Sequence, residues 1–214
     1  MNYLITAGPT REFIDDVRYV SNLSSGRMGY ALAAAAKDAG HQVMLVSGPT
    51  ALPPPEGVRF APVVSAGQMR EVVLTSLPQA DIIVMCAAVA DYRPARKLTG
   101  KMKKGPETIR LEMVKTPDIL AELGGRKESR ILVGFALEAD NPLENARAKM
   151  AAKNTDMIVL NPPAAMNAET ARVHVLTPDG AVTEIGPAAK HTIAVEIIKM
   201  IDSLPGKQPV SPQE

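Results

Sequence analysis

Polar residues gather at two places that follow apolar stretches of the chain. The first is the segment from Ala7 to about Arg27, which is long for a connection between a strand and a helix. Its side chains could hold a charged ligand: Arg11, Glu12, Asp15, Asp16, Arg18, Asn22, Ser24 and Ser25. Residues 24–26 (SSG) lead into a predicted helix, whose free N–H groups favour an anion. The alternative interpretation is an ordered surface loop that ends in an ordinary serine cap.

The second place is residues 87–94 (AAVADYRP), which follow the apolar run at 81–86 (DIIVMC). Small residues at the carboxyl end of a strand let a ligand approach the backbone closely. Asp91 and Arg93 then add one carboxylate and one guanidinium. Phe135, at the end of another apolar run, could pack against a planar ring.

Lysines supply positive charge in two further segments. Residues 101–104 (KMKK) lie between Gly100 and Gly105, which predicts a mobile cationic lid that binds phosphate. Lys149 and Lys153 are four residues apart and therefore share one helix face. In both cases the alternative is a solvated group of charges.

Several other chemistries lack their residues. His41, His174 and His191 show no metal-ligand spacing, and no Ser-His-Asp arrangement is legible. Cys86 closes an apolar strand with no histidine nearby, which favours a core residue over a nucleophile. The first loop lacks a G-x-G dinucleotide fingerprint, which counts against a nicotinamide or flavin oxidoreductase.

The elements that must position these residues follow from apolar periodicity. Strands are predicted at residues 3–6, 42–46, 58–63, 81–86, 131–135, 157–160, 172–177 and 181–185. Helices are predicted at residues 28–39, 67–76, 117–123, 142–153 and 188–203. This alternation predicts a doubly wound, Rossmann-like parallel sheet with an antiparallel edge hairpin, in one domain over residues 1–204. The tail at 205–214 is predicted to be disordered. In such sheets ligands bind beyond the carboxyl ends of the strands.

Composition narrows the class of protein. The chain has 24 Lys and Arg against 23 Asp and Glu, a net charge of +1, which disfavours a nucleic-acid-binding module. No apolar run approaches the length of a membrane span, and the N-terminus lacks the basic region of a signal peptide. A single cysteine excludes an internal disulfide and fits a reducing, cytoplasmic location.

Six segments together resemble the phosphopantothenate–cysteine ligases of coenzyme A biosynthesis. They are TAGPTREFIDDVRYVSNLSSGRMGYALA, AAVADYRP, KMKK, TPDIL, GFALEA and the Lys149/Lys153 helix, in the family's order and spacing over about residues 3–203. The KMKK segment resembles the bacterial, CTP-using branch. The resemblance implies condensation of 4′-phosphopantothenate with L-cysteine through an acyl-cytidylate, with release of pyrophosphate and CMP. It also implies Mg²⁺ with the CTP, whose ligands it does not identify, and a homodimer with the active site at the subunit interface.

The resemblance assigns roles by position. Asn22 would hold the activated carboxyl, Arg18 the substrate phosphate from the neighbouring subunit, and Lys101 would be the lid residue that helps convert the intermediate. Ala87, Ala88 and Asp91 would line the substrate and nucleotide pocket. The nucleotide-binding set would comprise Asp91, Lys101, Pro117, Asp118, Ile119, Leu120, Phe135, Lys149 and Lys153.

An arm at about residues 93–115 would help the chain dimerise. The arm is longer than the usual connection within a compact domain. The alternation of Ile109, Leu111 and Met113 is typical of a strand that pairs with another segment.

The first strand begins at Asn2 or Tyr3, so no flavin domain is expected in this chain. A flavin-dependent phosphopantothenoylcysteine decarboxylase is the expected partner, and a non-catalytic partner of that decarboxylase is a further alternative.

The sequence departs from the family pattern at four positions. Phe13 and Asp16 replace two prolines of the first loop, which predicts a looser loop. Ala139 replaces a threonine whose hydroxyl could contact a ligand, and Pro162 replaces an acid after a late strand. Asn22 and Lys101 match the pattern.

Overall fold

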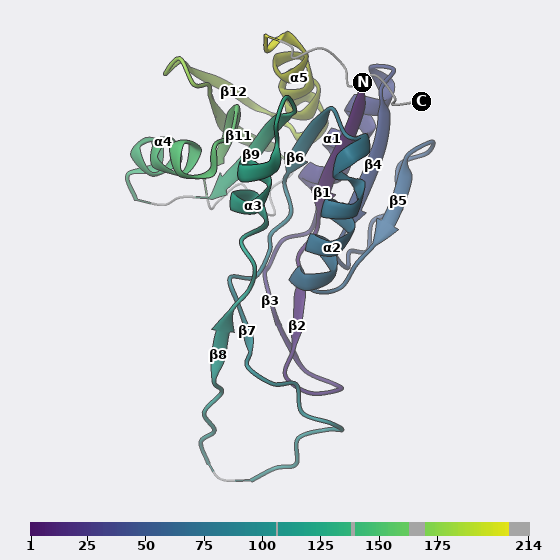
Figure 1. Ribbon diagram of the computed structural model, residues 1–214, viewed down its shortest axis with the longest axis vertical. Coiled ribbons are helices and arrows are strands. Elements are labelled where there is room, and N and C mark those ends of the chain that lie inside the picture. Colours follow the sequence, from purple (N-terminus) through teal and green to yellow (C-terminus); the bar gives the residue numbers. More distant parts are fainter. Residues whose placement is uncertain (106, 138–139, 163–169, 206–214) are drawn as a thin grey trace.

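The computed structural model describes residues 1–105, 107–137, 140–162 and 170–205. Within these residues the chain forms an 8-stranded sheet in the order β12-β11-β10-β9-β6-β1-β4-β5 (Figure 1). The parallel strands are β1 (Asn2–Ala7), β4 (Gln42–Ser47), β5 (Arg59–Pro62), β6 (Ile82–Met85), β9 (Ile131–Leu137) and β10 (Met157–Asn161). The antiparallel strands β11 (Thr170–Leu176) and β12 (Val182–Ala189) complete one edge. The predicted doubly wound α/β sheet with an edge hairpin is confirmed.

Helices cover both faces of the sheet. They are α1 (Arg27–Asp38), α2 (Ala66–Ser76), α3 (Ile119–Arg126), α4 (Pro142–Lys153) and α5 (Lys190–Ser203), with a short 3₁₀ turn, η1, at Leu77–Gln79. The buried side chains of α1 and α5 pack against one face of the strands. Those of α2 and α3, with α4 beside them, pack against the other. The structure is therefore a three-layer sandwich of helices, sheet and helices.

Local sequence explains why these elements form. Successive residues of β1 point to opposite faces, so Ile5 belongs to the α1/α5 core and Leu4 to the α2/α3 core. Ser65 caps α2 through a capping box with Gln68. Asp118 caps α3 by accepting a hydrogen bond from the Ala121 N–H.

Two antiparallel ribbons extend from the carboxyl end of the sheet. The strands β2 (Arg11–Phe13) and β3 (Tyr19–Ser21) form a hairpin, and β7 (Tyr92–Pro94) pairs with β8 (Met113–Lys115). Beyond β7 and β8 the chain continues as an arm that runs away from the sheet, next to the hairpin (Figure 1). The Leu98 N–H donates to the Ile14 carbonyl at 2.9 Å and ties the two ribbons together.

Some predictions about local structure need correction, and others lie outside the described residues. The segment before α1, expected to be a loop, contains the β2–β3 hairpin. Ile109 and Leu111 are exposed and lie in no strand of the single chain, whereas Met113 begins β8 and pairs with Pro94. Helix α3 begins at Ile119, so Pro117 precedes the helix. Residues 206–214 of the predicted tail, and Ala139, lie outside the described residues.

No helix in the described residues is long and apolar enough to cross a membrane.

Candidate functional site

The site lies where the strand order reverses, between β1 and β6. The segments after these strands are fastened to each other: the Ala88 N–H donates to the Gly8 carbonyl at 2.9 Å, and the Ala90 N–H donates to Thr10 Oγ1 at 3.0 Å. Open α/β sheets bind ligands in the crevice at such a reversal. The first loop and the AAVADYRP segment, distant in sequence, therefore form one surface.

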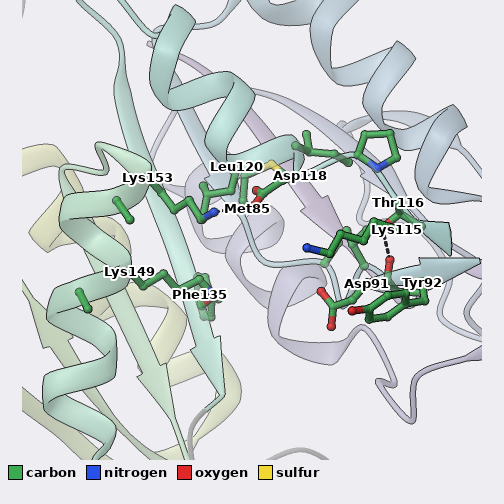
Figure 2. Close-up of a pocket in the computed structure, with 17 residues that line it drawn as sticks. Met85, Asp91, Tyr92, Lys115, Thr116, Asp118, Leu120, Phe135, Lys149 and Lys153 are labelled. Atoms are coloured by element: carbon green, nitrogen blue, oxygen red, sulfur yellow. Dashed lines mark hydrogen bonds and ion pairs between the residues drawn. The ribbon is translucent and has the colours of Figure 1, made fainter.

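A cavity of about 820 Å³ opens beside this surface, and we call it the large cavity. Its walls come from β6, the β7–β8 base, the start of α3, β9 and α4. Figure 2 shows Lys149 and Lys153 on one side of it, with Asp91 and Tyr92 on the other. Predicted residues on its wall are Ala87, Asp91, Pro117, Asp118, Ile119, Leu120, Phe135, Lys149 and Lys153. The prediction that Lys149 and Lys153 share one helix face is confirmed.

Ion pairs and hydrogen bonds hold the lysines of α4 in place. Lys149 Nζ donates to the Phe135 carbonyl at 2.9 Å, and Lys153 Nζ donates to Asp118 Oδ2. Partial burial alone would raise the pKa of Asp118. The hydrogen bonds from Lys153 and the Ala121 N–H, with the nearby lysine charges, outweigh this effect and lower that pKa below its usual value. Asp118 is therefore ionised at neutral pH and ties α3 to α4.

A second cavity, of about 410 Å³, adjoins the first, and we call it the central cavity. The two share walls formed by Ala87, Val89, Asp91, Phe135 and Lys149. The central cavity continues to Asn22, whose Nδ2 donates to the Ala88 carbonyl at 2.8 Å. The amide is thus anchored at the reversal of strand order, with its remaining polar groups available to a ligand.

Residues at the start of α1 and α5 bring positive charge to the central cavity. Arg27 and Lys190 line it together with Ser24 and Ser25. Burial, and then the charge of Arg27, lower the pKa of Lys190. Because Arg27 and Lys190 lie close together, this wall of the cavity is suitable for an anion.

Cys86 also lines the central cavity, but its thiol is a poor nucleophile. The residue is half-buried and packs against the α1/α5 core, as predicted. Burial raises the pKa of its thiol to about 12. The thiolate needed for nucleophilic attack is therefore scarce at neutral pH.

Arg18 and Lys101 lie elsewhere, where the hairpin meets the arm. Asp15 accepts hydrogen bonds from the Val17 and Arg18 N–H groups through Oδ1 and from the Met102 N–H through Oδ2. The Arg18 guanidinium lies 3.4 Å from Asp15 and 3.5 Å from the Met102 carbonyl. Lys101 is exposed, and neither Arg18 nor Lys101 lines a cavity described here. Within one chain the structure therefore does not bring them to Asn22.

Phe13 and Asp16, which were expected to loosen the first loop, both contact the arm. Asp16 accepts a hydrogen bond from the Gly100 N–H at 2.7 Å and forms an ion pair of 2.7 Å with Lys97. The Phe13 ring lies under the same lysine, with the ammonium 5.5 Å from the ring centroid. These positions therefore fasten the hairpin to the start of the KMKK segment, a role that the expectation of a looser loop did not include.

Some residues of the site have no local signal in the sequence. Lys190 lines the central cavity because α5 begins directly after the end of β12. Asn161 lines the same cavity, and its buried Oδ1 has no hydrogen-bond partner in the described part of the chain. A buried polar atom without a partner is costly, so Asn161 is a candidate ligand contact. Its position at the end of β10, another parallel strand, was the available clue.

Two of the three histidines take part in structural contacts. His41 lies 3.0 Å from Asp202, and His174 lies 3.4 Å from Glu184. Among the residues that the structure describes, no group of three or more His, Cys, Asp and Glu side chains could hold a metal ion.

A family model described as the DNA/pantothenate metabolism flavoprotein C-terminal domain matches residues 1–204. The chain is similar to the coenzyme A biosynthesis bifunctional protein CoaBC of Bacillus subtilis (strain 168), with 46% identity over 206 residues, 94% of this chain and 51% of that protein. CoaBC of Escherichia coli (strain K12) is 45% identical over 188 residues, 84% of this chain and 46% of the relative. The chain therefore spans about half the length of these curated relatives.

Solved structures show the same fold. The crystal structure of the C-terminal domain of a CoaBC protein superposes with a TM-score of 0.81 at 42% identity, covering 94% of this chain and 93% of that one. A Cab2 mutant in complex with phosphopantothenate-cysteine superposes with a TM-score of 0.77 at 17% identity, covering 94% and 86% of the two chains.

Proposed function

This chain belongs to the family of the DNA/pantothenate metabolism flavoprotein C-terminal domain, and we propose that it is a phosphopantothenate–cysteine ligase of coenzyme A biosynthesis. In this proposal it condenses 4′-phosphopantothenate with L-cysteine and uses CTP to activate the carboxylate. The names of the CoaBC relatives support the pathway.

The observation that carries the proposal is the junction of the two cavities. The large cavity has room for a nucleotide, and it meets the central cavity at Ala87, Asp91, Phe135 and Lys149. A second substrate in the central cavity would have its carboxylate near Asn22, next to that junction. The carboxylate and the nucleotide that transfers its cytidylyl group to it can therefore lie end to end.

The first step is activation, because a free carboxylate resists attack by an amine. A carboxylate oxygen attacks the α-phosphorus of CTP, pyrophosphate leaves, and an acyl-cytidylate results. Lys149 and Lys153 are placed to attract the nucleotide, and Arg27 and Lys190 to attract phosphate groups. Asn22 can donate a hydrogen bond to the acyl phosphate, since Ala88 fixes the direction of its amide. The protein contributes positioning and charge and needs no nucleophile of its own.

Mg²⁺ would accompany the triphosphate and offset its charge. In nucleotide sites this ion usually keeps several waters and takes one or two carboxylates besides the phosphates. Asp91 is an exposed carboxylate on the wall that both cavities share, and it fits that requirement.

The second step joins the cysteine amine to the acyl carbon and releases CMP. Lys101 is proposed to act in this step, and Arg18 to hold the substrate phosphate, both from a partner subunit, since they lie on the arm and the hairpin, which extend beyond the body of the domain (Figure 1). Exposed apolar residues on these ribbons support a C2 homodimer: Val17, Tyr19, Val20, Leu23, Tyr92, Ile109 and Leu111. A flavin-dependent phosphopantothenoylcysteine decarboxylase remains the proposed partner domain.

A pyrophosphate-release assay tests the proposal. The protein is given 4′-phosphopantothenate and Mg²⁺ with either CTP or ATP, with and without cysteine. We expect CTP to support turnover better than ATP, and a stoichiometric release of pyrophosphate without cysteine. Equal turnover with ATP would contradict the CTP assignment, and no nucleotide-dependent product with either nucleotide would contradict the ligase assignment.

A further inference from the structure

A third cavity, of about 420 Å³, lies between the β2–β3 hairpin and residues 49–52, and we call it the hairpin cavity. It adjoins the segment at 22–27 that also borders the central cavity. Four residues line both: Asn22, Ser24, Ser25 and Arg27. A ligand in the hairpin cavity would therefore approach Asn22 from a second direction, without passing through the large cavity.

The walls of the hairpin cavity carry positive charge without a compensating acid. Arg11 and Arg27 line it, and none of its lining residues is Asp or Glu. Within the described part of the chain, neither arginine forms an ion pair, whereas Arg18, Arg70 and Arg130 each have a carboxylate partner. Glu12, next to Arg11 in sequence, is buried and accepts a hydrogen bond from the Ala66 N–H. Two such arginines at one cavity favour an anionic ligand.

Arg11 is held ready for such a ligand. Its guanidinium stacks over the Tyr19 ring, 4.7 Å from the centroid, and both residues lie on the hairpin. Stacking uses the face of the guanidinium and leaves its N–H edge for hydrogen bonds. A planar carboxylate fits that edge with two parallel hydrogen bonds.

We propose that the hairpin cavity binds the amino-acid acceptor of the ligase reaction, with Arg11 on the carboxylate of the incoming cysteine. The inference rests on the proposed function, because an acyl-cytidylate must be held at Asn22. The nucleotide and the pantothenate occupy the large and central cavities, so the amine needs another route to the acyl carbon. Of the cavities described here, the hairpin cavity is the remaining one that reaches Asn22.

The charges around this cavity also suit the reaction. The amine of cysteine must lose its proton before it attacks, and nearby positive charge lowers the pKa of an ammonium group. Arg27, which lines both the hairpin cavity and the central cavity and is unchanged in a variant of Arg11, would supply that charge. The nitrogen then bonds to the acyl carbon, the bond from that carbon to the cytidylate oxygen breaks, and CMP leaves with the electron pair. The protons released from nitrogen pass to solvent.

The test separates recognition of the acceptor from the first half-reaction. Arg11→Gln removes the charge, and Arg59→Gln on β5 is the matched control, because Arg59 is exposed and lines none of the described cavities. Pyrophosphate release without cysteine reports activation. Single-turnover reaction of the preformed acyl-cytidylate is then followed with cysteine, and with cysteamine, which lacks the carboxylate.

We expect Arg11→Gln to raise the cysteine concentration for half-maximal rate about 10- to 100-fold, as for loss of a charge-assisted hydrogen bond. Pyrophosphate release and the cysteamine reaction should keep their parent rates, and Arg59→Gln should change nothing. An unchanged cysteine dependence, or equal slowing with cysteine and cysteamine, would overturn the proposal. A higher requirement for phosphopantothenate would instead assign the cavity to the substrate phosphate. Absence of product from the parent protein would count against the proposed function itself.

Discussion

Gly124 marks a place where α3 and α4 touch so closely that one methyl group would separate them. A Cβ atom built at Gly124 would lie 2.0 Å from the Lys153 carbonyl oxygen and 3.4 Å from Asn154 Cβ. The Asn154 side chain also donates to the Gly124 carbonyl at 2.8 Å. Because Lys153 lines the large cavity, the spacing of these two helices sets part of the proposed nucleotide site.

Gly124→Ala should therefore destabilise the fold. To bring the Lys153 carbonyl oxygen from 2.0 Å to ordinary van der Waals contact, α4 must retreat by roughly 1.4 Å, and overpacking of this kind costs about 1–3 kcal/mol. The neighbouring Gly125→Ala is the matched control, since a Cβ there meets nothing within 4 Å. Alanine is the better helix former by up to about 1 kcal/mol, so Gly125→Ala should be neutral or more stable than the parent. The difference between the variants isolates the clash, because both gain the same helix propensity.

Urea denaturation at neutral pH measures the free energy of unfolding of the two variants and the parent. We expect Gly124→Ala to fall below Gly125→Ala by about 1–3 kcal/mol, with unchanged m-values. Calorimetric titration should show weaker CTP binding for Gly124→Ala, because Lys153 is displaced from Asp118. If Gly124→Ala is as stable as Gly125→Ala, the close approach of α3 and α4 is wrong.

Three further predictions concern the site and the assembly. Asp118→Asn should lower the free energy of unfolding by less than about 1 kcal/mol, since the carboxylate is 54% exposed. Because the pKa of Asp118 is lowered in the fold, this deficit should be full above the ordinary value of 3.8 and vanish as pH falls through the lowered pKa, as measured by urea denaturation between about pH 6 and pH 3. Lys101→Gln should still release pyrophosphate, and the acyl-cytidylate should accumulate in quenched mixtures analysed by mass spectrometry. Asn22→Asp should release less pyrophosphate, because the carboxylate at position 22 repels the phosphate. Product at the parent rate with Lys101→Gln would make residues 101–104 a solvated group of charges. Light scattering at micromolar concentration should show a dimer, and a fully active monomer would contradict the role of the arm at about residues 93–115.

The sequence alone determined the layered sheet, because the signals for it are local. Residues 82–85 form an unbroken apolar run, as a strand covered on both faces requires, and β6 lies in the middle of the sheet. Pro178, Asp179 and Gly180 indicate the turn between β11 and β12. Each signal involves residues within a few positions of one another, so no long-range contact is needed to interpret it.

The sequence also indicated which residues could share a site, through the rule that parallel strands present their carboxyl ends at one edge. Asp91, Phe135, Lys149 and Lys153 do line one cavity. The spacing of Lys149 and Lys153 already placed them together, because four residues make about one helical turn.

Only the tertiary structure decided which charges are compensated and which face a cavity. Asp15 and Asp16 read as candidates for ligand contacts, but hydrogen bonds from Met102 and Gly100, more than 80 residues away, occupy them. Arg11 and Arg18 both belong to the polar segment at residues 7–27, yet Arg18 pairs with Asp15 whereas Arg11 stacks on Tyr19 beside an open cavity. The physical reason is that a charge acts through space over a few ångströms, and the fold, which brings distant segments within that range, sets its partners.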